Sequence, residues 1–206
     1  YIIYDENEEG GKKSPILKFM SESEIAELEN RLEPKNGDII FFSADEFKRA
    51  VSILNKVRLA LRDKFNLADP KKLALCWIID FPMFEQDEAS GKIDFAHNPF
   101  SMPIGWLEAF EKWDLLSMKA NQYDLACNGY EILSGSIRNY DVAVLIKAFE
   151  AVGRSKDEVI NKFGAMYEAF QYGVPPHGWF AIGMDRFMMI LTDEPNVREV
   201  FAFPKA

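Results

Sequence analysis

The feature that most constrains the fold is a pair of strand-like stretches that meet near Asn128-Gly129. The first stretch covers residues 123–130 and the second covers residues 131–137. Asn-Gly is a common turn dipeptide, so we expect the two stretches to pair as neighbouring strands. The pair indicates a sheet that is largely antiparallel.

Other short strands are predicted along the chain. Residues 1–4 and 15–20 are apolar and flank a polar run with Gly10-Gly11, which favours a hairpin. Residues 38–42 have the composition of a buried strand, and the continuous apolar run at 73–80 is typical of a central strand. Two further short strands are expected at residues 93–96 and 179–182.

The helices have clear starting signals. A Ser followed three residues later by Glu is a capping box, and this pattern occurs at Ser21, Ser43 and Ser155. The second of these helices should end near Asn66, and the third near Tyr172. Further helices are expected at 141–151 and 185–191, and short strands with grouped helices indicate an α+β fold.

A domain boundary is predicted between about residues 65 and 72, where Asp69-Pro70 interrupts the pattern. This divides the chain into segments 1–66 and 67–206. The helix before the boundary carries six Lys and Arg residues. We favour a solvated helix face over an RNA contact for them.

Composition limits the classes of protein to consider. The 206 residues are 48% hydrophobic and 14% aromatic, which is enough for a substantial core and argues against disorder. The formal charge of -9 disfavours a dedicated nucleic-acid-binding module, although an enzyme could still contact RNA through a local surface. Cys76 and Cys127 form no zinc or disulfide pattern and are expected to be buried free thiols. We find no signal peptide or membrane-spanning run. The chain opens in what reads as a strand, which favours a fragment of a longer protein.

Two stretches in the middle of the chain contain residues suited to binding anions or metals. His97 lies in a loop before Asn98-Pro99, where its charge can be tuned near neutral pH. Glu131 and Arg138 bracket the small residues Ser134, Gly135 and Ser136, which would let a ligand approach the strand. Glu131 and Ser134 need a bulge at the small residues to face the same pocket. The plainer alternatives are a surface histidine and a Glu–Arg surface ion pair.

Two later stretches complete the set. Gly183, Met184, Asp185 and Arg186 join a strand to a helix, and a helix N-terminus with an arginine suits phosphate. The alternative is an Asp N-cap with a solvated Arg. The turn at residues 172–178, which includes His177, is expected to be structural.

Together these stretches resemble the catalytic domain of bacterial-type aspartyl-tRNA synthetases, which are class II enzymes. The resemblance runs from about Leu75 to Lys205, beginning with the segment at residues 75–85. It continues through His97-Asn98-Pro99-Phe100, residues 128–138, residues 173–177 and Gly183-Met184-Asp185-Arg186, the last of which resembles class II motif 3. Residues 1–66 are similar to the second half of that family's insertion domain, so residues 67–206 would be the C-terminal part of the catalytic domain. The family's anticodon-binding barrel, motif 1 and motif 2 are not found in this chain.

The resemblance implies a fold and a chemistry. The fold would be a class II antiparallel sheet flanked by helices and preceded by part of a small α+β insertion domain. The activity would be that of an aspartate–tRNA ligase, which joins L-aspartate and ATP into aspartyl-adenylate and transfers the aspartyl group to tRNA(Asp). Whether tRNA(Asn) is also charged stays open. The cofactors would be ATP and Mg²⁺, and the full-length enzyme would be a cytoplasmic homodimer with no membrane contact.

The resemblance also implies residue roles. Arg138 would bind the side-chain carboxylate of aspartate, and His97 would close over it. Glu131 would hold ATP through Mg²⁺, and Arg186 would bind the γ-phosphate. Gly183, Met184 and Asp185 would form the nucleotide floor, with Ser134, Gly135 and Ser136 in support.

The chain departs from the family pattern at two positions, and two other functions are alternatives to the aspartate–tRNA ligase. Many family members have a second His where this chain has Asn98, and a small residue where it has Trp179. The Trp179 ring could narrow the pocket or pack behind the sheet. An asparagine or lysine enzyme is one rival. A non-catalytic paralogue that binds RNA or protein is the other, and the joint presence of Glu131, Arg138 and Arg186 argues against it.

Overall fold

The computed structural model describes residues 1–69 and 71–204, and the chain divides into two compact units between residues 69 and 70. Pro70, part of the expected chain break, lies outside the described residues. The assignment of the first unit to an insertion domain and of the second to a catalytic domain stays a prediction.

The first unit has a three-stranded antiparallel sheet of order β2-β1-β3, formed by β1 (Ile2–Tyr4), β2 (Lys12–Lys13) and β3 (Ile39–Ile40). The predicted pairing of residues 1–4 with 15–20 is wrong. Residues 17–19 form a 3-10 turn after Pro15, which has no N–H to give to a strand ladder, and the shorter β2 takes that place. The strand at 38–42 exists as β3, but Ile39 is 48% exposed, so the predicted burial is wrong.

Two helices complete the first unit, α1 (Glu22–Leu32) and α2 (Phe47–Lys64). The Ser21–Glu24 capping box is confirmed, and its hydrogen bonds from Ser21 lower the pKa of the Glu24 carboxyl. The capping box predicted at Ser43 is wrong, because α2 begins after Glu46 without a side-chain cap.

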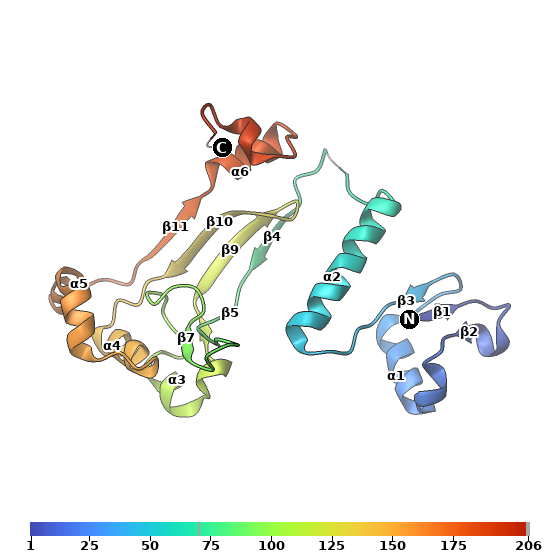
Figure 1. The fold of residues 1–206 in the computed structure, drawn as a ribbon, viewed down its shortest axis with the longest axis horizontal. Coiled ribbons are helices and arrows are strands. Elements are labelled where there is room, and N and C mark those ends of the chain that lie inside the picture. The colour runs from blue at the N-terminus through green and yellow to red at the C-terminus, as the bar shows by residue number, and fades with distance from the viewer. Residues whose placement is uncertain (70, 205–206) are drawn as a thin grey trace. The chain divides into compact units, whose positions relative to one another are not determined.

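The second unit is built on a four-stranded antiparallel sheet of order β11-β10-β9-β4 (Figure 1). Its strands are β4 (Leu75–Ile78), β9 (Gln122–Cys127), β10 (Tyr130–Ile137) and β11 (Gly178–Ile182). The Asn-Gly hairpin is confirmed, since Cys127 pairs with Tyr130 and both turn residues have positive φ. Strand β4 lies at the edge of this described sheet with all four residues exposed, so its predicted central position is wrong. Cys76 is therefore exposed, against expectation, whereas Cys127 is buried.

The remaining elements lie around this sheet. Two small ladders pair β5 (Phe81–Pro82) with β8 (Lys119–Ala120) and β6 (Phe84–Gln86) with β7 (Ile93–Phe95). The helices are α3 (Trp106–Lys112), α4 (Val142–Ala151), α5 (Lys156–Gln171) and α6 (Met184–Leu191), with 3-10 turns at residues 115–117 and 197–200. Helix α5 starts at the predicted Ser155–Glu158 capping box. Helices α3, α4 and α5 gather at one end of the long strands and α6 at the other (Figure 1). No helix among the described residues is long and apolar enough to cross a membrane.

The buried core lies at the α3–α5 end. One cluster joins Met83, Phe84, Met118 and Ala148, and a second joins Leu145, Phe149 and Val159. This core fixes the end of β10 that carries Arg138, because the loop after residue 97 packs Phe100 against Phe149.

The two faces of the sheet differ in chemistry. Directly paired residues in an antiparallel sheet project to the same side, and successive residues alternate. One side, which we call the polar face, carries Gln122, Asp124, Glu131, Ser134, Ser136 and Trp179. The opposite side carries Leu75, Trp77, Leu125, Leu133, Phe180 and Ile182, and is apolar.

Gly135 lies on the apolar side, and its lack of a side chain is required there. A Cβ at this position would come within 2.3 Å of the Trp179 carbonyl oxygen and 2.5 Å of the Tyr123 ring. The small residue therefore makes room for neighbouring protein atoms. The expectation that Gly135 lets a ligand approach is wrong for this side of the strand.

Replacing Gly135 with Ala should lower the free energy of unfolding by about 1–3 kcal/mol, because a backbone carbonyl cannot move aside easily. Urea titration followed by circular dichroism measures this. Gly164→Ala is the matched control, since Gly164 lies in α5 and a Cβ there would meet nothing within 4 Å beyond the backbone of its own helix. That variant should be neutral or stabilised by up to about 1 kcal/mol. Equal effects of the two substitutions would contradict the packing argument.

Candidate active site

Strand β10 carries the predicted acid at its start and the predicted arginine just beyond its end. Glu131 and Arg138 are seven residues apart, which corresponds to roughly 20 Å along an extended strand. The pairing register shifts between Glu131 and Leu133, so Ile132 forms a bulge. The bulge places Glu131 and Ser134 on the polar face as expected, but it lies at Ile132 and not at the small residues.

At the start of β10, helix α6 is fixed to the strand by its first turn. The Arg186 Nη1 atom donates a hydrogen bond of 3.0 Å to the backbone carbonyl of Glu131 and lies 3.8 Å from its carboxylate. The Gly183 N–H donates to the Ile132 carbonyl at 2.9 Å. The structure thus brings the predicted acid and the motif-3-like arginine together, with both side chains half exposed.

The contact of Arg186 with Glu131 and the cap of α6 exclude two alternatives that the sequence left open, a Glu131–Arg138 ion pair and an Asp N-cap. Glu131 and Arg138 do not form a surface ion pair with each other, because Glu131 pairs with Arg186. The cap of α6 is Gly183, while Asp185 lies in the first turn, so the alternative of an Asp N-cap is also wrong. Gly183 has a φ of -75°, so the turn itself does not require glycine. The first-turn N–H groups of α6, which have no acceptor within a helix, lie beside a half-exposed cation and can bind phosphate.

At the other end, the loop that carries His97 docks onto Arg138. Ser101 forms a β-bridge with Arg138, and the Arg138 guanidinium lies 5.5 Å from the centre of the Phe100 ring. The Arg138 N–H donates to the His177 carbonyl at 2.9 Å, so the turn at residues 172–178 supports this end. The Phe100 ring and the His177 carbonyl therefore hold Arg138 in place. Its planar guanidinium is suited to binding a carboxylate.

His97 and Asn98 have separate tasks in this loop. The His97 ring packs on Phe81 with centroids 5.2 Å apart. The Asn98 side-chain oxygen accepts hydrogen bonds from the Phe100 N–H and the Ser101 hydroxyl. Asn98 thus shapes the loop, which gives a structural reason for the departure from a second histidine.

Between the two ends, the polar face contains buried polar atoms without partners. Asp124 Oδ1, Ser136 Oγ and Trp179 Nε1 have no hydrogen-bond partner within the described chain. Buried polar groups are nearly always hydrogen-bonded, so three such atoms on one face indicate a surface that something else completes. Asp124 was not predicted from the sequence. Strand alternation relates it to Gln122, but only the pairing of β9 with β10 places it beside Ser134.

Trp179 narrows this surface. It pairs with Ser136, so its side chain projects to the polar face and does not pack behind the sheet. A ligand that reaches from Arg138 to Glu131 must cross the row formed by Ser136 and Trp179.

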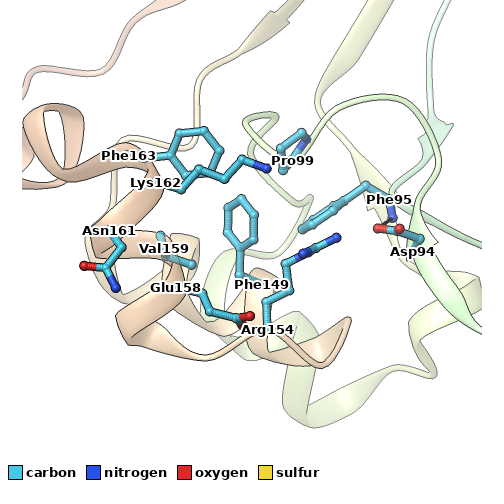
Figure 2. A pocket seen from close by; sticks show the side chains of 10 residues that line it. All are labelled: Asp94, Phe95, Pro99, Phe149, Arg154, Glu158, Val159, Asn161, Lys162 and Phe163. Carbon is cyan, nitrogen blue, oxygen red and sulfur yellow. Dashed lines mark hydrogen bonds between the residues drawn. The ribbon is translucent and has the colours of Figure 1, made fainter.

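A separate cavity of about 620 Å³ lies behind the His97 loop (Figure 2). Among its lining residues, Pro99 belongs to the His97-Asn98-Pro99-Phe100 stretch. No group of three or more His, Cys, Asp or Glu residues that could hold a metal ion occurs among the described residues. A cation bound by carboxylates of the polar face would need further ligands from a bound substrate or from other protein groups.

The sheet is antiparallel, with an acid and a helix-borne arginine at one end and a second arginine at the other, an arrangement whose cations suit anionic groups at both ends. The family model of class II tRNA synthetases (D, K and N) matches residues 7–206, and the chain belongs to this family.

Curated relatives narrow the similarity. The chain is 50% identical over 203 residues to an aspartate–tRNA(Asp/Asn) ligase of Chlorobium phaeovibrioides, a match that covers 98% of this chain and 34% of the relative. It is 47% identical over 197 residues to an aspartate–tRNA ligase of Streptomyces avermitilis, covering 96% of this chain and 34% of the relative. An aspartyl-tRNA synthetase structure from Entamoeba histolytica is 23% identical with a TM-score of 0.49, and the match covers 89% of this chain and 30% of that one. The chain spans about a third of the length of the curated relatives it matches.

Proposed function

We propose that this chain is the part of an aspartate–tRNA ligase that binds aspartate at Arg138 and ATP at Glu131 and Arg186. The observation that carries the proposal is the placement of these residues at the two ends of one strand, joined by a polar face with unpartnered groups. A carboxylate of aspartate attacks the α-phosphorus of ATP, pyrophosphate leaves, and the aspartyl group then passes to the terminal ribose of tRNA. Positioning and charge stabilisation account for most of the first step.

Each end of the strand has its own task. The Arg138 fork matches a planar carboxylate, and it disfavours asparagine, whose amide offers one acceptor fewer. His97 closes over the bound amino acid from the loop that docks on Arg138. Arg186 and the first turn of α6, with Gly183, Met184 and Asp185, bind the phosphates of ATP. Ser134 and Ser136 line the path between the two ends.

The acids of the polar face fit a magnesium ion. Glu131 and Asp124 both project to this face from adjacent strands, and carboxylate oxygens are ligands that Mg²⁺ prefers. When bound with ATP, the ion would neutralise phosphate charge. The Asp124 oxygen without a partner supports a role for this residue beside the predicted Glu131.

The partners follow from the same proposal. The full-length enzyme acts on L-aspartate, ATP and tRNA(Asp) as a cytoplasmic homodimer, and the relatives' names leave tRNA(Asn) as a second tRNA substrate. The competing proposal of a non-catalytic RNA- or protein-binding paralogue is disfavoured by the retention of Glu131, Arg138 and Arg186 together.

Aspartate-dependent ATP–pyrophosphate exchange tests the proposal. The full-length enzyme should catalyse exchange with aspartate, while asparagine and lysine should give no signal above background. Exchange with asparagine or lysine alone would assign the chain to a sibling enzyme, and no exchange with any amino acid would favour the non-catalytic paralogue.

The 206-residue chain by itself should form no aspartyl-adenylate, because no motif 2 arginine is found in it. The same exchange assay on the purified chain measures this. Its competence to fold is checked separately by near-ultraviolet circular dichroism. Robust exchange by the chain alone would contradict the division of the site between this segment and another.

Trp179 should decide how much room the amino acid has. In the full-length enzyme, Trp179→Gly should change KM for aspartate by about tenfold or more and leave KM for ATP within about twofold, because the ring lies on the Arg138 side of the polar face. Phe180→Leu is the matched control, since Phe180 projects to the apolar side. A Trp179→Gly variant with unchanged aspartate KM would show that the ring lies outside the substrate path.

A further inference from the structure

The cavity behind the His97 loop is formed entirely within the second unit. Its apolar lining is aromatic, from Phe95 of β7, Phe149 of α4 and Phe163 of α5 (Figure 2). Phe149 packs against both other rings, with centroids 5.1 Å and 5.7 Å away. Val159, which is buried, and Pro99 complete the apolar surface. A cavity of about 620 Å³ is within the usual range for small-molecule sites.

Two cations lie at the rim of this cavity. Arg154 follows α4 and Lys162 lies on α5, and neither has an ion-pair partner among the residues the structure describes. Figure 2 shows the Lys162 ammonium reaching across the opening toward Pro99 and the Arg154 guanidinium reaching toward Phe95. The Lys162 ammonium lies 5.8 Å from the centre of the Phe163 ring. A ligand in the cavity can therefore contact an aromatic ring and a positive charge that are adjacent to each other.

Two carboxylates at the same rim limit the charge of the ligand. The Glu158 carboxylate accepts a hydrogen bond from the Ser155 N–H, and the Asp94 carboxylate accepts one from the Phe95 N–H. Each acid thus has one backbone donor and keeps its charge, while the two cations have no ion-pair partner among the described residues. Two negative charges nearby disfavour a polyphosphate and favour a ligand with a single negative charge.

We propose that this cavity is a binding site for an aromatic carboxylate, separate from the polar face of the sheet. The ring of the ligand lies among Phe95, Phe149 and Phe163, and its carboxylate is bound by Arg154 and Lys162. Burial of the ring supplies most of the affinity, and the two rim cations select the acid over a neutral analogue. The site does not depend on the proposed synthetase activity.

Indole-3-acetate is the probe that tests this site, titrated into the 206-residue chain by calorimetry and by ligand-observed NMR. We expect saturable binding of one molecule per chain. The neutral indole-3-acetamide should bind at least tenfold more weakly. The double variant Arg154→Gln/Lys162→Gln should weaken acetate binding by at least tenfold, and Lys92→Gln, outside the cavity, should leave it unchanged.

Cavity-filling variants separate this site from other apolar surfaces of the chain. Val159→Trp should abolish binding. Asn161→Trp changes an exposed lining residue, so it should abolish binding with less risk to folding. Absence of saturable binding to the folded wild-type chain overturns the proposal. So does an affinity that neither the double variant nor Asn161→Trp changes, because the probe would then bind elsewhere.

Discussion

Arg138→Ala should cause a large loss of aspartate activation in the full-length enzyme. Arg138 lies at the end of β10 with its guanidinium against the Phe100 ring and its backbone held by His177, so its position is fixed before substrate arrives. Truncating one partner of a desolvated, hydrogen-bonded charge pair costs about 2–5 kcal/mol. This corresponds to a fall in kcat/KM for aspartate of roughly 30- to 5000-fold, measured by pyrophosphate exchange.

Two companion variants distinguish carboxylate binding from a loss of structure. Arg138→Lys keeps the charge but loses the planar fork, and it should recover only a small part of the activity. Lys92→Ala removes an exposed cation from the same unit, outside the stretches assigned to either site, and it should leave exchange with aspartate unchanged. If Arg138→Ala activates aspartate at the wild-type rate, the carboxylate is bound elsewhere.

The fold was most predictable where local signals and packing agree. The Asn-Gly turn, with positive φ at both residues, and the capping boxes at Ser21 and Ser155 act over three or four residues and were confirmed. The capping box at Ser43 was wrong, because the chain enters α2 three residues later and leaves Ser43 outside the helix. A capping pattern specifies a possible start, but the surrounding chain decides where the helix begins.

Burial was harder to predict than strand position. The apolar run at residues 73–80 contains β4, yet Leu75 is 59% and Trp77 is 58% exposed. Hydrophobicity predicts that such residues are buried by packing, but it does not say which part of a protein packs against them. The apolar side of the sheet in this chain has the composition of a surface packed against another element.

The candidate site could be located from the sequence only in part. The spacing of Glu131 and Arg138 placed them on one strand, but their partners come from segments far along the chain, namely α6 for Glu131 and the loop at 97–101 for Arg138. Asp124 was missed because a single acid in a strand has no distinctive pattern until the register places it next to Ser134. Gly135 was misassigned because a small residue looks the same whether it admits a ligand or a neighbouring ring.

Arg186→Gln should produce the other large loss of activity. Its effect on substrate binding should be confined to ATP. The Arg186 guanidinium is half exposed beside the first turn of α6, where it can reach a phosphate while one Nη1 bond holds the Glu131 carbonyl. Removing one such preorganised charge donor typically lowers kcat by about 10²- to 10³-fold. In exchange assays with varied substrate, the variant should lose kcat and bind ATP more weakly, while KM for aspartate stays within about twofold.

Because Arg186 also links α6 to β10, its structural role has to be separated from its role toward ATP. Glu131→Gln keeps the backbone carbonyl that Arg186 contacts but removes the carboxylate charge 3.8 Å away, so the fold should be retained while the Mg²⁺ concentration needed for half-maximal exchange rises. The unfolding midpoints of both variants should stay close to wild type, since a half-exposed ion pair contributes only about 0–1 kcal/mol. If Arg186→Gln instead loses activity in parallel with its unfolding midpoint, and added ATP does not restore any of it, Arg186 fixes α6 to the sheet and the γ-phosphate is bound by another group.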